Sequence, residues 1–140
     1  MYESLRVPWV RAVLLVGVTY LAVGIIFATL AGWAASHQIR AAWRLAAWLI
    51  SAVVFGVHVG YEQLQLRSSP RTTALHASLA VALGAGALAV AAIVHAHGVA
   101  GYARYLAFLV WPVLSGLPAF VVALTAATVL ARARRSTDEE

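Results

Sequence analysis

Glu62 is the one acidic residue in the middle of the chain, and histidines lie on both sides of it in the sequence. His58 precedes it by four residues and His76 follows it by fourteen. Carboxylate and imidazole groups can exchange protons, bind a divalent metal or, in the case of imidazole, ligate haem iron. The surrounding sequence is largely apolar, and an ionisable group inside a membrane segment marks a functional site by default.

Four chemical interpretations of this group are open at the level of sequence. In the first, His76 hydrogen-bonds Glu62, and the side chain of Arg67 or Arg71 also approaches the carboxylate. These contacts fix the register of the two helices. In the second, His58, Glu62 and His76 bind a divalent metal such as zinc or iron. In the third, haem b is held between His58 and His76. In the fourth, Glu62 carries protons or binds a cation for transport.

Composition places the chain in the membrane class. Hydrophobic residues make up 63% of the 140 residues, only 11% are charged, and the mean hydropathy is +0.86. Soluble domains have about 25% charged residues. The net charge of +5 is carried by arginines at the borders of apolar runs, where they contact lipid headgroups, so we expect no nucleic-acid partner. The chain has no cysteine, which excludes disulfides and thiolate chemistry within it.

Four apolar runs predict four membrane spans, because each reaches the roughly 20 residues that cross a hydrocarbon core of about 30 Å. The expected spans are about 12–36, 43–66, 72–97 and 105–131. We therefore expect an all-α integral membrane protein, a single domain over 1–140, with four transmembrane helices as two antiparallel hairpins in a compact bundle. Residues 132–140 form a short charged tail, which we expect to be solvated and frayed.

The arginines predict the orientation. Four spans place the N-terminus, the second loop and the C-terminus on one side, which collects seven of the ten basic residues and leaves three on the other. By the positive-inside rule, we expect a multi-pass protein of the inner cell membrane with both termini in the cytoplasm. The seven are Arg6, Arg11, Arg67, Arg71, Arg132, Arg134 and Arg135, and the three are Arg40, Arg44 and Arg104.

The second span carries a polar stripe. Arg44, Ser51, His58 and Gln65 recur every seven residues, and Glu62 follows His58 by one turn. In lipid, this stripe is expected to face protein. With Tyr61 at its border and His76 opposite, the predicted intramembrane polar cluster is Ser51, His58, Tyr61, Glu62, Gln65 and His76.

The connection between the second and third spans is too short for anything but an antiparallel hairpin. It reads RSSPR, and Glu62 and His76 each lie seven residues from Ser69. We therefore expect these two side chains at similar depth, with His58 about one turn deeper.

Small residues recur at helix-packing spacing in two spans. Such residues let helix backbones approach closely, either within the chain or between copies of it. The expected packing positions are Gly24, Ala28 and Gly32 in the first span and Ala80, Gly84, Ala87 and Ala91 in the third.

Two prolines interrupt the fourth span. Pro112 and Pro118 flank Ser115 and Gly116, and each proline removes a backbone donor. We expect the helix to kink or unwind locally here, either as a packing kink or as the broken helix that some transporters use to bind substrate.

On function, the sequence favours a small non-enzymatic accessory or interaction subunit that packs, forms a homo-oligomer or joins a larger membrane complex through its small-residue faces. The alternative is a protein that binds haem b or a metal, or a proton-coupled transport or ligand-binding protein, using His58, Glu62 and His76. No phosphate loop, dinucleotide fingerprint or nucleophile motif of soluble enzymes is present.

Overall fold

A computed structural model describes residues 8–95 and 102–138, which form four α-helices. These are α1 (Pro8–Gly32), α2 (His37–Leu64), α3 (Pro70–His95) and α4 (Tyr102–Asp138). Neither of the two described ranges contains a strand. Each helix includes a stretch long and apolar enough to cross a membrane. The predicted all-α, four-span fold is therefore confirmed, and the chain is a multi-pass membrane protein.

The outer surface of the bundle is apolar. Within the most apolar stretch of each helix, only 11% to 17% of the residues are buried inside the molecule. Many leucine and valine side chains point outward, and Trp33 and Trp48 are 80% and 78% exposed. Water-soluble monomers rarely expose an apolar surface of this extent, so this surface requires lipid as its solvent.

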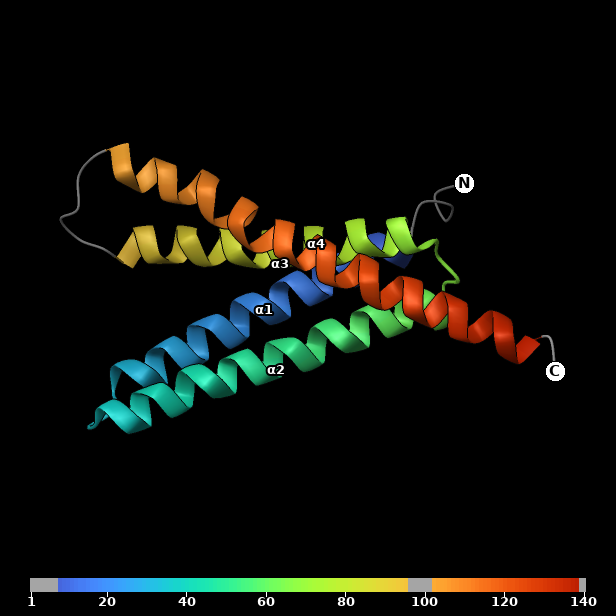
Figure 1. Cartoon of the computed structure of the whole chain (residues 1–140). Coiled ribbons are helices and arrows are strands. Elements are labelled where there is room, and N and C mark those ends of the chain that lie inside the picture. Colours follow the sequence, from blue (N-terminus) through green and yellow to red (C-terminus); the bar gives the residue numbers. More distant parts are fainter. Residues whose placement is uncertain (1–7, 96–101, 139–140) are drawn as a thin grey trace, which may run out of the picture.

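The helices are arranged as two antiparallel pairs, α1 with α2 and α3 with α4 (Figure 1). α3 lies between α4 and α1 and packs against both, whereas α2 has smaller contacts with α3 and α4. The start of α1, the α2–α3 connection and the end of α4 lie at one end of the bundle, which we call the turn end. The two pairs come together toward this end and separate toward the opposite end.

The core of the turn end is built largely from alanine. Val59 of α2 packs with Ala74 and Ala77 of α3 and with Ala123 and Ala127 of α4, and all five are buried. Side chains this small bring three helix backbones close together, as is usual in membrane bundles. A polar group on this part of α2 is therefore surrounded by protein.

The connection between α1 and α2 is shorter than predicted. α2 begins at His37 rather than near residue 43, because the side chain of Ser36 caps it by accepting a hydrogen bond from the N–H of Ile39 at 3.2 Å. Arg40, now in the first turn of α2, donates from Nε to the carbonyl oxygen of Ala31 at 3.3 Å. The same carbonyl oxygen, at the end of α1, also accepts from the N–H of Ala34 at 3.4 Å, so Arg40 links the start of α2 to the end of α1.

The expectation of a frayed C-terminal tail is wrong over the residues that the structure describes. α4 continues through the charged segment to Asp138. Arg134 donates from its guanidinium to the carbonyl oxygen of Gln63 at 2.8 Å. A cation favours the C-terminal end of a helix, where carbonyls lack partners and the helix dipole is negative, so Arg134 ties α4 to the end of α2.

The two prolines of α4 lie inside a continuous helix. The chain does not unwind at Pro112 or Pro118, so the predicted local unwinding is wrong, while the predicted kink stays a prediction. Gly116 is buried, and a Cβ placed on it would lie 3.4 Å from the Cβ of Ala82. Ser115 is half-buried beside it. This segment of α4 therefore packs on α3.

α1 and α3 cross at a pair of glycines. A Cβ placed on Gly84 would lie 2.6 Å from the Cβ of Tyr20 and 3.1 Å from the carbonyl oxygen of Gly17. Gly17 itself is buried against Ala80. Gly17 was not among the predicted packing positions, although its spacing of seven residues from Gly24 places both on one helix face.

The other predicted packing positions differ in their surroundings. A Cβ on Gly24 would meet the side chain of Leu88 at 3.0 Å, whereas Gly32 has nothing within 4 Å. Ala28 is exposed. In α3, the half-buried positions are Ala87 and Ala91.

The glycine crossing predicts that an added methyl group destabilises the protein at Gly84 but not at Gly56. Gly84→Ala forces Tyr20 or the α1 backbone to shift, and overpacking of this kind costs about 1–3 kcal/mol. Gly56→Ala in α2 is the matched control, because nothing lies within 4 Å of the added Cβ. We expect thermal unfolding in detergent to show a lower midpoint for Gly84→Ala and an unchanged or higher one for Gly56→Ala. Equal midpoints for the two variants would contradict the crossing.

Candidate functional site

A short capped turn positions the site. Ser69 begins α3 by accepting a hydrogen bond from the N–H of Thr72 at 3.2 Å, and Pro70 occupies the first helical position. The N–H of Ser68 donates to the carbonyl oxygen of Glu62 at 3.1 Å. Arg67 adopts a left-handed backbone conformation, with φ of 50°, which reverses the chain within a few residues. The end of α2 and the start of α3 are therefore held side by side.

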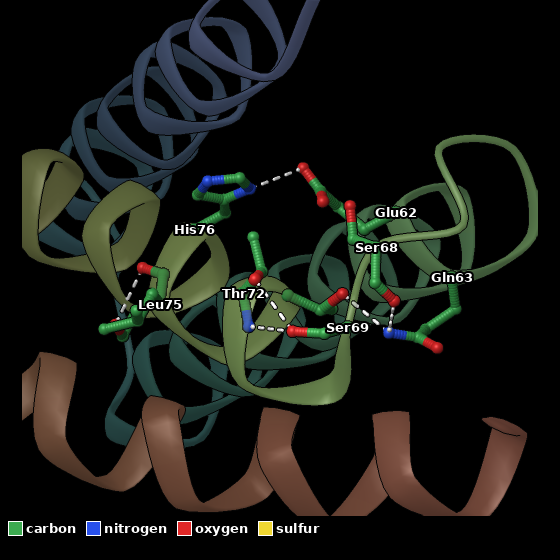
Figure 2. Close-up of polar contacts among 9 residues, drawn as sticks. Glu62, Gln63, Ser68, Ser69, Thr72, Leu75 and His76 are labelled. Atoms are coloured by element: carbon green, nitrogen blue, oxygen red, sulfur yellow. Dashed lines mark hydrogen bonds and ion pairs between the residues drawn. The ribbon is translucent and has the colours of Figure 1, made fainter.

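Glu62 and His76 meet across this turn, as the depth argument predicted. Nδ1 of His76 lies 3.0 Å from Oε1 of Glu62, and Figure 2 shows the ring and the carboxylate pointing toward each other. The Glu62 side chain is fully buried, whereas 14% of the His76 side chain is exposed. The carboxylate is thus enclosed by protein, and the imidazole is the partly exposed member of the pair.

Trp9 of α1 adds a third helix to the site. Its ring stacks on that of His76 with centroids 4.5 Å apart and an angle of 3° between the planes. Stacked aromatic pairs contribute about 0.5–1.5 kcal/mol beyond their burial. The imidazole is therefore held by Glu62 at its edge and by Trp9 on its face.

The bond between Glu62 and His76 is compatible with two positions of one proton. With the proton on His76, Nδ1–H donates to the carboxylate oxygen. With the proton on Glu62, the carboxyl O–H donates to Nδ1. The 3.0 Å separation is a normal hydrogen-bond length for both arrangements. The proton can therefore move between Nδ1 and the carboxylate oxygen without a change in the distance between these two atoms.

Two buried polar atoms close to this pair have no hydrogen-bond partner. They are Oε2 of Glu62 and Nε2 of His58. His58 is 3% exposed and lies one helical turn before Glu62 on α2. Leaving a buried polar atom unpaired costs about 1–3 kcal/mol, and more for a charged one, so these two atoms mark places where a proton or a ligand would be stabilised.

His58 also lines a groove between α1 and α2. The groove has a volume of about 1100 Å³, and Tyr61 contributes to the same wall. Tyr61 is 44% exposed, Gln65 is exposed where α2 ends, and Ser51 is half-buried two turns from His58. The structure therefore brings together Glu62 and His76, with His58 nearby, and leaves the other predicted members of the cluster outside the contact.

Gln63 and Thr73 are polar residues of the site that sequence reasoning missed. They are 3% and 0% exposed. Nε2 of Gln63 donates to Oγ1 of Thr73 at 2.7 Å and to the carbonyl oxygen of Ser68 at 3.1 Å. Gln63 lies six residues before Ser69 and Thr73 four residues after it, so the equal outward count that paired Glu62 with His76 does not pair these two.

The three candidate ligands do not form a metal site in the part of the chain that the structure describes. Among residues 8–95 and 102–138, no three His, Asp or Glu side chains form a group that could hold a metal ion, so the possible ligands His58, Glu62 and His76 do not converge. Of the two histidines, His58 lines the groove between α1 and α2, and His76 does not. Arg67 and Arg71 are exposed, and in the described structure Glu62 is bonded to His76 instead of to either of them.

Comparison with other proteins gives no match. No known protein family matches the chain, and no curated protein or solved structure matches it either. The geometry of the buried carboxylate and its neighbours is therefore what indicates a function.

The hydrogen bonds of Gln63 predict a sharp difference between two neighbouring glutamines. Gln63→Ala leaves the hydroxyl of Thr73 and the carbonyl of Ser68 without their donor, and we expect a loss of about 1–3 kcal/mol. Gln65→Ala removes an exposed side chain and should change the free energy of unfolding by less than about 0.5 kcal/mol. Denaturation in one detergent measures both. Similar losses for the two variants would show that Gln63 does not hold the turn.

Proposed function

We propose that this chain is a small proton-coupled membrane protein, without enzymatic activity, in which the Glu62–His76 pair takes up and releases a proton. The observation that supports it is the fully buried carboxylate, bonded through one oxygen to a partly exposed imidazole and unpaired at the other. Ionisable groups placed in this way inside membrane proteins commonly carry protons.

The cost of burying charge determines how many protons the pair holds. A lone carboxylate in a low-dielectric interior is unstable unless it is paired or neutralised. With one proton, the pair is either a carboxylate beside an imidazolium or a carboxylic acid beside a neutral imidazole. Losing this proton leaves an uncompensated buried carboxylate, and gaining another leaves an imidazolium without its counter-ion. The charge of each group therefore depends on whether the other one holds the proton.

Proton exchange at this pair would change contacts among three helices. His76 is the partly exposed member of the pair and is the route by which a proton reaches Glu62. Glu62 belongs to α2, His76 to α3, and Trp9, which stacks on His76, belongs to α1. A change in charge at His76 alters its contacts with both other helices, which couples protonation to how the helices pack.

The arginines support an orientation for this proton site. The turn end carries Arg11, Arg67, Arg71, Arg132, Arg134 and Arg135, whereas Arg40 and Arg44 lie at the opposite end. We propose that the turn end faces the cytoplasm and that the protein resides in the inner cell membrane. Protons would then enter the pair from the cytoplasmic side.

The expected role as an accessory or interaction subunit depends on small-residue helix faces, of which Ala28 and Gly32 are exposed. Some of the glycines and alanines at its predicted oligomer faces pack within the chain instead, since Gly24, Ala80 and Gly84 contact neighbouring helices. The Glu62–His76 pair, by contrast, carries an unpaired oxygen that helix packing alone does not require. The buried contact between two ionisable groups is what supports proton coupling.

Infrared spectroscopy of the protein in proteoliposomes tests the proposal. As the pH is raised from about 5 to about 8, the range in which histidine normally titrates, we expect the carboxyl C=O band of Glu62 to change intensity. Glu62→Gln should remove this change and His76→Gln should shift it to another pH. Ser51→Ala, a polar change on the same helix outside the pair, is the matched control and should keep it.

A purely structural pair behaves differently. If the Glu62 carboxyl band stays constant over this pH range while Glu62→Gln lowers only thermal stability, the pair fastens helices together and does not exchange protons. That result would overturn the proposed function.

A further inference from the structure

The groove between α1 and α2 is a feature that the proton site does not use. It runs along the first half of α1 and the second half of α2, with a volume of about 1100 Å³. This is the size of a pocket for a substantial organic ligand, since such pockets measure about 300–1,000 Å³. Leu14, Leu15, Val53 and Val57 are among its apolar lining residues.

Polar side chains in the groove are gathered toward the turn end. Arg11, His58 and Tyr61 line it there, within two turns of the start of α1 or the end of α2. Thr19 lies toward the other end and donates its hydroxyl to the carbonyl oxygen of Leu15 at 2.8 Å, so it is already satisfied. The groove thus has a polar end and a long apolar remainder.

The polar end suits an anionic group. Arg11 supplies a positive charge and N–H donors, and Tyr61 supplies an O–H donor; both side chains are exposed. None of the described residues that line the groove is acidic. Phosphate oxygens are the complement of arginine and hydroxyl donors, and such charge-assisted hydrogen bonds are strong.

The length of the groove matches one leaflet. Its α1 wall extends from Pro8 to Thr19, which at 1.5 Å per residue is about 17 Å. Half of a hydrocarbon core of about 30 Å is about 15 Å. A lipid with its head at the turn end would therefore lay an acyl chain along the groove and end near the middle of the bilayer.

We propose that this groove binds an anionic phospholipid of the leaflet at the turn end, with the phosphate held by Arg11 and Tyr61 and one acyl chain along the apolar walls. The site is distinct from the Glu62–His76 bond and does not depend on proton exchange there. It makes a membrane lipid a specific ligand of this protein and not only its solvent.

Native mass spectrometry of the protein in mild detergent tests this site with phosphatidylglycerol and phosphatidylcholine as probes. We expect the protein to retain phosphatidylglycerol about tenfold more tightly, and Arg11→Gln to abolish this preference. Arg135→Gln removes the same charge at the same end of the bundle but outside the groove, and it should leave the preference intact. Val57→Trp fills the groove from a position that is 67% exposed, so it should block binding while the protein still folds.

Three results would overturn the inference. Equal retention of the two lipids by the unmodified protein would show ordinary solvation by lipid. Equal effects of Arg11→Gln and Arg135→Gln would show nonspecific attraction to positive charge. Displacement of phosphatidylglycerol by inorganic phosphate or by palmitate at equal concentration would show that the site selects a free anion or a fatty acid. None of these results bears on the infrared titration of Glu62, so the two proposals fail separately.

Discussion

A carboxylate that is buried inside a membrane bundle has to be neutralised by a partner that is fixed in place, and in this protein His76 is that partner. Glu62 is 0% exposed and its bond to His76 measures 3.0 Å. An unpaired charge in this environment would destabilise the fold by several kcal/mol. The contacts around the pair are therefore those that keep the end of α2 against the start of α3.

Several independent contacts serve this one requirement. The Gln63 amide fastens the connection to Thr73, Arg134 of α4 binds the last turn of α2, and Trp9 of α1 covers the imidazole. The alanine core of α2, α3 and α4 lies immediately behind them. Away from this end the two helix pairs separate, and the remaining close crossing of α1 with α3 depends on glycine. The fold is most tightly specified where the buried charge lies.

Local features of the sequence predicted the helical spans and the contact across the short α2–α3 connection. The lengths of the apolar runs gave the four spans, and the short RSSPR connection with equal counts on each side gave the Glu62–His76 contact. Contacts between elements distant in the chain were not predictable. Trp9 on His76 and Arg134 on Gln63 depend on how α1 and α4 cross the hairpin, which helical periodicity does not encode. The metal alternative depended on three side chains converging, which the sequence leaves open; among the described residues, His58, Glu62 and His76 do not form such a group.

A double-mutant cycle on Glu62 and His76 tests the central claim most directly. Glu62→Gln removes the charge, His76→Phe removes the ring nitrogens while keeping an aromatic face for Trp9, and the free energy of unfolding in detergent is measured for both single variants and the double variant. If the bond organises the turn end, the coupling energy is about 1 kcal/mol, the size of a good interhelical polar contact in a membrane protein. If the two losses add to within about 0.3 kcal/mol, the residues are energetically independent and the account is contradicted.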